Sequence, residues 1–332
     1  MSGVTTKTVG DGETGMRLDR WFKVHFPGVR HGQLEKLLRK GQVRVDGGRA
    51  KANRRLESGE VVRIPPLEAG AADAGGAKPA PPQRDRAADV AFLRKLIIYQ
   101  DDAIIALNKP FGLAVQGGAK TARHLDQMLY ALEKNGERPR LVHRLDRDTG
   151  GLLLLARSRA SAAALGGAFQ RHEIDKAYWA LVVGSPRPRA GRIDLKVAQR
   201  MVRVGAGEQE RIVPADGEDA KKAITDFQIV EEAGGAVSFA ALRPITGRKH
   251  QLRVHCAAIG APIVGDRKYG GPTAMVEGVG DILHLFCRQM TFPHPATGKI
   301  TTIAADLGGP MLKTWRFFGF DQDAEISWPE AL

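Results

Sequence analysis

A stretch with almost nothing to bury constrains how this chain can fold. From Glu68 to Asp89 the sequence consists mainly of alanine, glycine and proline, with scattered charges. Segments of this composition form flexible linkers, because they lack the apolar surface that offsets the entropy lost on folding. We therefore expect a disordered tail over residues 1–15, a small domain over 16–66, a linker over 67–90, a larger domain over 91–312 and a C-terminal tail over 313–332.

The small domain is predicted to hold two amphipathic helices followed by short strands. Apolar residues recur at helical spacing from Leu18 to Phe26 and again over residues 31–40, and short strands are expected over 42–45 and 61–64. Basic residues occupy the opposite faces of both helices. This pattern resembles the αL-motif RNA-binding domain named after a small-subunit ribosomal protein. The resemblance implies RNA contacts by Arg17, Arg20, Lys23, Lys36, Arg39 and Lys40, and the alternative is a solvated charged face.

The chain as a whole is strongly basic, with a formal net charge of +13 at pH 7. Such a charge favours a polyanionic partner, either nucleic acid or an anionic membrane surface. No apolar stretch approaches the roughly 20 residues of a membrane span, and the N-terminus lacks the apolar core of a signal peptide. We therefore expect a cytoplasmic protein that does not bind membranes. Cys256 and Cys287 lack the spacing of a zinc site or a disulfide framework, so two buried thiols are expected.

The larger domain alternates predicted strands and helices. Strands are expected over residues 103–109, 151–157, 176–183 and 236–243, and helices over 123–133, 158–171 and 246–259, with Ser158 as a helix N-cap. This order indicates an α+β fold, with a large, mixed, mostly antiparallel sheet and flanking helices.

A charged loop stands directly before one of these strands. It runs from His143 to Gly151, and Asp146 at its centre has Arg144 and Arg147 as sequence neighbours. Nearby cations favour the ionised form of a carboxylate. An ionised carboxylate in a basic cleft can act as a nucleophile or as a base. From this pattern alone, the competing interpretation is a surface cluster of salt bridges.

Four segments resemble one known family, in the family's own order. The charged loop, HRLDRDTGG, resembles the HRLDxxTSG motif of the RluA/RluC/RluD family of ribosomal large-subunit pseudouridine synthases, with Gly150 where the family commonly has serine. Residues 108–115, 176–184 and 246–255 resemble the family's NKPxGxxV, KxYxALVxG and TGRxHQ(I/L)RVH segments. With its N-terminal domain, the chain is most similar to the RluC and RluD type. The resemblance implies an RNA pseudouridine synthase, which is an isomerase that needs no cofactor and no metal.

The resemblance also implies catalytic roles for three residues. Asp146 is expected to be the catalytic carboxylate, which acts at the sugar either as a nucleophile on C1′ or as a base toward the 2′ position. Arg253 is expected to pair with this carboxylate, and Arg248, five residues upstream, is the competing partner. Tyr178 is expected to pack against the flipped uracil and to assist proton removal.

The expected substrate-binding residues are His143, Arg144, Arg248 and His250, with Arg144 filling the gap left by the extruded base. The expected substrate is 23S ribosomal RNA, free or in a pre-ribosomal particle, and the expected state is a monomer. Base extrusion requires basic residues to hold the surrounding phosphates.

Two sequence patterns are weak signals for other sites. Gly10, Gly12 and Gly15 match GxGxxG but lie in a polar segment with no strand and helix around them, so no dinucleotide site is expected. His250 and His255 are five residues apart and do not share a helix face as the histidines of an HExxH zinc site do. Two competing functions remain, a non-catalytic RNA-binding or ribosome-assembly factor and a metal-dependent hydrolase built on the histidines.

Overall fold

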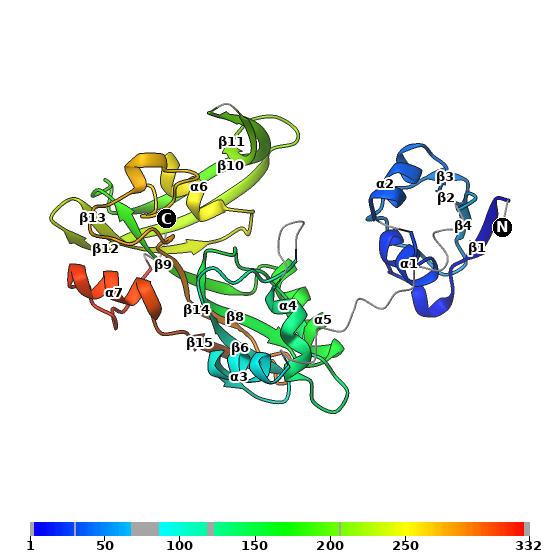
Figure 1. The fold of residues 1–332 in the computed structure, drawn as a ribbon, viewed down its shortest axis with the longest axis horizontal. Coiled ribbons are helices and arrows are strands. Elements are labelled where there is room, and N and C mark those ends of the chain that lie inside the picture. Colours follow the sequence, from blue (N-terminus) through cyan, green and yellow to red (C-terminus); the bar gives the residue numbers. More distant parts are fainter. Residues whose placement is uncertain (1–2, 30, 68–85, 118–122, 206, 329–332) are drawn as a thin grey trace. The chain divides into compact units, whose positions relative to one another are not determined.

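The computed structural model of this chain describes residues 3–29, 31–67, 86–117, 123–205 and 207–328. The chain divides into two compact units, unit 1 (residues 1–83) and unit 2 (residues 84–332). In Figure 1, unit 1 is blue, and unit 2 runs from cyan to red. This division falls within the expected linker, of which residues 68–85 lie outside the described ones. Among the described residues, no helix has the length and apolar content needed to cross a membrane.

Unit 1 contains the two helices that the sequence predicts, α1 (Leu18–His25) and α2 (His31–Arg39). Its sheet, as far as the structure describes it, has the strand order β1 (Thr5–Thr8), β4 (Val61–Ile64), β2 (Arg44–Val45) and β3 (Gly48–Arg49). The apolar helix faces supply the core, which includes Leu18, Trp21, Phe22, Leu34 and Leu38.

The prediction of a disordered tail over residues 1–15 is wrong for most of that segment. Strand β1 pairs antiparallel with β4, and a short 3-10 helix, η1 (Asp11–Glu13), follows it. The Glu13 carboxylate accepts a hydrogen bond from the Trp21 indole at 2.8 Å and lies 2.5 Å from the His25 ring. All four side chains of β1 are exposed. Backbone hydrogen bonds to β4 hold this edge strand, and none of its side chains is buried. The sequence therefore lacks the apolar alternation from which a strand could be predicted.

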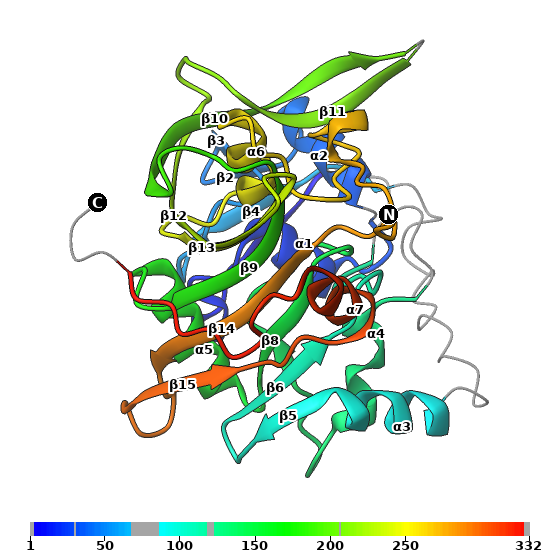
Figure 2. The same cartoon turned by 90° about the vertical axis from the view of Figure 1, so that its left-hand side faces the viewer.

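Unit 2 is built on one large, mixed, mostly antiparallel sheet, which confirms the predicted fold class. Within described residues 86–328, nine strands follow the order β11-β10-β12-β13-β9-β14-β8-β6-β5, while β15 pairs with β14 and β7 with β8. The bounds are β5 (Ile97–Gln100), β6 (Ile104–Lys109), β7 (Arg140–Leu141), β8 (Gly150–Ala156), β9 (Asp175–Val183), β10 (Ala190–Val204), β11 (Gly207–Pro214), β12 (Lys221–Ala233), β13 (Val237–Pro244), β14 (Leu285–Pro293) and β15 (Ile300–Ala304). Figure 2 shows β10 and β11 side by side as a hairpin at one end of this sheet.

Unit 2 has fewer residues in helices than in strands, and its helices cover parts of the sheet. They are α3 (Arg86–Leu96), α4 (Leu125–Met128), α5 (Arg159–Gln170), α6 (Gln251–Ala258) and α7 (Gly309–Phe318), with 3-10 turns η3 (Leu129–Leu132) and η4 (Gly271–Ala274). The helix expected over residues 123–133 is thus split into α4 and η3. Helix α5 begins as predicted, because the Ser158 hydroxyl accepts the Ser161 backbone N–H at 3.0 Å. Every residue of β8 is buried, as its apolar run predicts.

Both predicted limits of the larger domain need correction. Helix α3 includes the last residues of the expected linker, where the buried Asp89 accepts a hydrogen bond from the Tyr130 hydroxyl at 2.9 Å. Helix α7 crosses the limit expected after residue 312. Its Trp315 is fully buried and stacks on Trp179 with ring centroids 5.7 Å apart. Trp315 and Phe320, within the expected C-terminal tail, therefore belong to the core of unit 2.

The helix expected over residues 246–259 begins later than predicted, at Gln251. The Gln251 side chain accepts the Thr246 hydroxyl at 2.7 Å and the Arg248 backbone N–H at 2.9 Å. His250, at the N-cap position, has a left-handed backbone conformation with φ 53°. These contacts hold residues 246–250 as a loop, although their side-chain pattern continues the helical spacing.

Candidate active site

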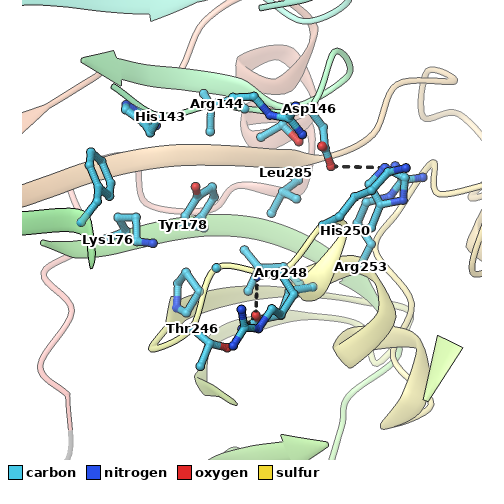
Figure 3. A pocket seen from close by; sticks show the side chains of 18 residues that line it. His143, Arg144, Asp146, Lys176, Tyr178, Thr246, Arg248, His250, Arg253 and Leu285 are labelled. Carbon is cyan, nitrogen blue, oxygen red and sulfur yellow. Dashed lines mark hydrogen bonds and ion pairs between the residues drawn. The ribbon is translucent and has the colours of Figure 1, made fainter. Parts of the chain in front are cut away.

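One cavity gathers the residues of unit 2 that the sequence singles out. It has a volume of about 310 Å³ and is walled by the loop before β8, by β9 and by the segment that leads into α6, as Figure 3 shows. The expected catalytic and substrate-binding residues all line it, namely Asp146, Tyr178, Arg253, His143, Arg144, Arg248 and His250. Segments far apart in the chain thus meet at one site.

A buried lysine holds the loop that carries Asp146, which we call the Asp146 loop (residues 143–149). Lys109, at the end of β6, is only 1% exposed. Its ammonium group donates hydrogen bonds to three backbone carbonyls, those of Pro110, Leu113 and Arg147, at 2.9–3.0 Å. Burial lowers the pKa of Lys109 to about 8, against the opposing effect of the Asp148 and Asp146 carboxylates. Lys109 is a positioning residue that the sequence analysis did not single out.

Close packing favours glycine at Gly150 and Gly151, the two residues directly after the Asp146 loop. A Cβ atom on Gly150 would lie 2.7 Å from the Phe111 ring, and one on Gly151 would lie 2.3 Å from the Cys287 carbonyl oxygen. Gly151 also has a φ of 101°, which strongly favours glycine. At position 150, where the family commonly has serine, the Phe111 ring occupies the space that a side chain would need. This packing accounts for the glycine in this chain.

Tyr178 and Lys176 reach the cavity from the same face of β9, since alternate residues of a strand share a face. Tyr178 is 9% exposed. Burial raises the pKa of Tyr178 well above its ordinary value of 10. At neutral pH its hydroxyl is therefore protonated, which argues against a tyrosinate base. Lys176, which the sequence analysis did not select, brings an ammonium group to the cavity, and burial lowers its pKa.

Asp146 faces His250, which corrects one predicted contact. Its Oδ2 lies 3.7 Å from the His250 Nε2, drawn as a dashed line in Figure 3. Arg253, the expected partner, instead forms a two-point ion pair with Asp266, with N–O distances of 2.8 and 2.6 Å. Arg248, the competing partner, is exposed and donates to the Lys222 carbonyl at 3.0 Å. Neither arginine forms the predicted pair with Asp146.

Asp266 is the carboxylate that Arg253 pairs with, although the charge of Asp146, in the same cavity, also acts to raise the pKa of Arg253. The Asp266 side chain is fully buried, and a buried carboxylate is costly unless it is paired and hydrogen-bonded. Besides Arg253, it accepts the backbone N–H groups of Lys268 and Tyr269, both at 3.1 Å. The only signal in the sequence is an aspartate after the apolar run at residues 262–264, which does not reveal its partner.

His143 and Arg144 have different environments although they are adjacent. His143 accepts the Leu154 backbone N–H through Nε2 at 2.8 Å and packs on the Phe169 ring. Burial and the nearby Lys176 charge lower the pKa of His143 to about 3, so the ring is neutral. Arg144 is exposed and lies 3.5 Å from the Gln116 side-chain oxygen. His143 therefore supports β8, while Arg144 is accessible to a ligand.

The six basic residues predicted to contact RNA lie on unit 1, and all of them are exposed: Arg17, Arg20, Lys23, Lys36, Arg39 and Lys40. Arg17 stands at the N-cap of α1 and pairs with Asp19 at 2.5 Å. The free thiols are buried, as predicted, at Cys256 and Cys287.

The chain is similar in sequence to RNA pseudouridine synthases. A family model described as RNA pseudouridylate synthase matches residues 103–258. The ribosomal large subunit pseudouridine synthase C of Escherichia coli strain K12 is 34% identical over 300 residues, which cover 89% of this chain and 90% of the relative. The relative of the same name from Haemophilus ducreyi is 35% identical over 303 residues, which cover 90% and 91%.

A solved structure supports the same assignment. Human RNA pseudouridylate synthase domain containing 4 superimposes with a TM-score of 0.59 at 27% identity, covering 70% of this chain and 96% of that one. The fold and the site of the present chain, together with these likenesses, define it as an RNA-modifying isomerase. The chain belongs to the RNA pseudouridine synthase family.

Titration of Lys109 gives a test of its buried environment. Because the folded pKa of about 8 lies below the ordinary value of 10.5, the unfolded chain binds more protons between these pH values. The free energy of unfolding of the wild type, relative to Lys109→Met, should therefore rise by about 2 kcal/mol between pH 7.5 and pH 10. Urea unfolding at both pH values measures it. A difference that is independent of pH, or that falls, would contradict the burial of this ammonium group.

The Gly150 and Phe111 pair predicts coupled substitutions. Gly150→Ser alone should destabilise the protein by about 1–3 kcal/mol, because its Cβ meets the Phe111 ring. In the background of Phe111→Ala, the same change should cost clearly less. Urea unfolding of the four proteins of this cycle measures the coupling. An equal cost in both backgrounds would show that the ring does not exclude the serine.

Proposed function

We propose that this enzyme isomerises uridines to pseudouridine in 23S ribosomal RNA, with Asp146 as its catalytic carboxylate. One observation carries the proposal. Asp146 lines the same cavity as Tyr178 and Arg253, in a chain that belongs to the RNA pseudouridine synthase family. The choice of ribosomal RNA rests on relatives named for the large ribosomal subunit.

The reaction needs only an intramolecular exchange of bonds. The N1–C1′ bond breaks, the uracil turns, and C5 bonds to C1′, while C5 loses a proton and N1 gains one. Asp146 acts at the sugar, by attack on C1′ or by removal of a proton at the 2′ position. Its distance of 3.7 Å from the His250 ring leaves it outside a strong ion pair, which keeps a carboxylate oxygen available to the substrate.

The walls of the cavity suit an extruded base. The Tyr178 ring and the Leu285 side chain offer apolar surface for the uracil. At the rim, the exposed Arg144, Arg248 and Lys249 are suited to phosphates or to the gap that the base leaves. We therefore propose that the rim holds RNA while the interior of the cavity handles the base.

We also propose that unit 1 is an αL-motif RNA-binding domain. Its two helices precede strands β2 to β4 in the expected order, and its six singled-out basic residues are exposed. We further propose that the enzyme acts as a monomer and that it acts in the cytoplasm.

Substitution of Asp146 tests its role directly. Asp146→Asn keeps the shape of the side chain but removes the nucleophile or base, so pseudouridine formation on ribosomal RNA should fall by at least about 10³-fold. Affinity for the RNA should stay within about two-fold. The matched control is Asp102→Asn, an exposed aspartate that pairs with Lys134 outside this cavity, which should keep near-normal activity. Near-normal activity of Asp146→Asn would refute the proposal.

Removal of residues 1–66 tests the role of unit 1. The shortened protein should bind folded ribosomal RNA more weakly and with a smaller dependence on salt, because phosphate contacts are lost. Its rate on a short RNA should change much less, since the cavity lies entirely in unit 2. Filter binding at several salt concentrations and single-turnover rates measure both quantities. Unchanged affinity for the folded RNA would contradict the assignment.

A further inference from the structure

His250 has a backbone conformation that needs an explanation. It is the N-cap residue of α6 with φ 53° and ψ 19°, and its side chain makes no capping hydrogen bond. This left-handed region is uncommon for residues other than glycine, asparagine and aspartate, and it costs on the order of 1 kcal/mol. Such strain persists only where surrounding contacts impose it.

The contacts that impose it come from Gln251. Its side-chain amide donates to the Ile224 carbonyl at 2.8 Å and to the Thr225 hydroxyl at 3.0 Å, while its oxygen accepts from Thr246 and Arg248. The side chain is buried and ties the start of α6 to β12. The ring of His250 is consequently held at the cavity wall, where the dashed line in Figure 3 marks its contact with Asp146.

Both nitrogens of the His250 ring face defined groups. Nδ1 lies 2.7 Å from the Tyr269 hydroxyl, and Nε2 lies 3.7 Å from Oδ2 of Asp146. The same hydroxyl accepts the Ile212 backbone N–H at 3.3 Å. A hydroxyl group can donate and accept at once, so the Tyr269 proton can go to Nδ1 while its oxygen accepts from Ile212. At the other end, an ionised carboxylate only accepts and so favours a proton on Nε2.

Both ends are compatible with one tautomer of a neutral ring, in which Nδ1 accepts and Nε2 carries the proton, and the carboxylate end favours it. Burial lowers the pKa of His250 to about 4, and the charges of Arg253, Lys268 and Lys249 act in the same direction, while Asp146 opposes them. Burial also raises the pKa of Tyr269, so its hydroxyl keeps the proton that it donates.

We propose that Tyr269 and His250 form a positioning relay for Asp146, in which the Tyr269 hydroxyl donates to Nδ1 and fixes a proton on Nε2 that faces the carboxylate. The inference rests on the proposed role of Asp146. Contacts of this kind are often long in the free enzyme and tighten when the substrate binds. The relay then holds Oδ2 in place and leaves the second oxygen for the sugar.

The Arg253 contacts belong to the same arrangement. Asp266 holds the Arg253 guanidinium and the backbone N–H of Tyr269, and that guanidinium lies 5.0 Å from the centre of the Tyr269 ring. Tyr269 is thus fixed from both its backbone and its ring. Its hydroxyl contacts both His250 and the Ile212 N–H, and Tyr269→Phe removes these two contacts while the ring contact stays.

Two substitutions of His250 separate the relay from a backbone role. Glutamine carries an amide N–H near the position of Nε2, whereas asparagine carries one near Nδ1 and suits the left-handed backbone better. If His250 only shapes the turn, His250→Asn should be the better enzyme. The relay predicts the reverse, with His250→Gln at least about 10-fold faster than His250→Asn in single turnover.

Tyr269→Phe should lower the single-turnover rate about 10-fold and leave RNA affinity within about two-fold. The matched control, Tyr99→Phe, removes an exposed hydroxyl on β5 and should leave the rate unchanged. Nitrogen-15 NMR of the resting protein, with His250 assigned from His250→Gln, should show the proton on Nε2, and Tyr269→Phe should weaken this preference.

Three results would overturn the relay: a proton on Nδ1 in the wild type, an unchanged rate in Tyr269→Phe, or an asparagine variant at least as fast as the glutamine variant. These results differ from failure of the proposed function. If the wild type forms no pseudouridine, the proposed function fails, and the NMR measurement still decides whether the tautomer is fixed as inferred.

Discussion

The active cavity depends on one buried ammonium group. Lys109 donates to the carbonyls of Pro110, Leu113 and Arg147, and so joins the end of β6 to the Asp146 loop. Burying a charge is costly unless it is fully hydrogen-bonded, so these three contacts stabilise one arrangement of the loop over others. The position of Asp146 depends on that arrangement, because the next residue, Arg147, supplies one of the three carbonyls.

A second buried charge organises the opposite wall. Asp266 fixes Arg253 and the backbone of Tyr269, and Tyr269 in turn contacts His250. The two walls meet where the His250 ring faces the Asp146 carboxylate. In this arrangement the groups that touch the substrate are few, and each is held by a residue that is itself fixed by hydrogen bonds. Such supporting contacts determine how well a catalytic group is oriented.

Local patterns in the sequence account for much of unit 2 and for the members of its site. The apolar run of β8 and the N-cap Ser158 are predicted correctly, because each depends on neighbours in the chain. The partner of Arg253 is not, since Asp266 becomes its neighbour only after folding. The start of α6 is missed for the same reason, as Gln251 anchors it to β12. Likewise, β1 depends on backbone pairing that leaves no apolar pattern.

The most direct test of the account is a map of pseudouridines in 23S ribosomal RNA from cells that have the gene and from cells that lack it. The account predicts that specific pseudouridines disappear when the gene is lost. They should return when the wild-type gene is restored and stay absent when the restored gene encodes Asp146→Asn. An unchanged map on loss of the gene, or full recovery by the Asp146→Asn protein, would contradict it.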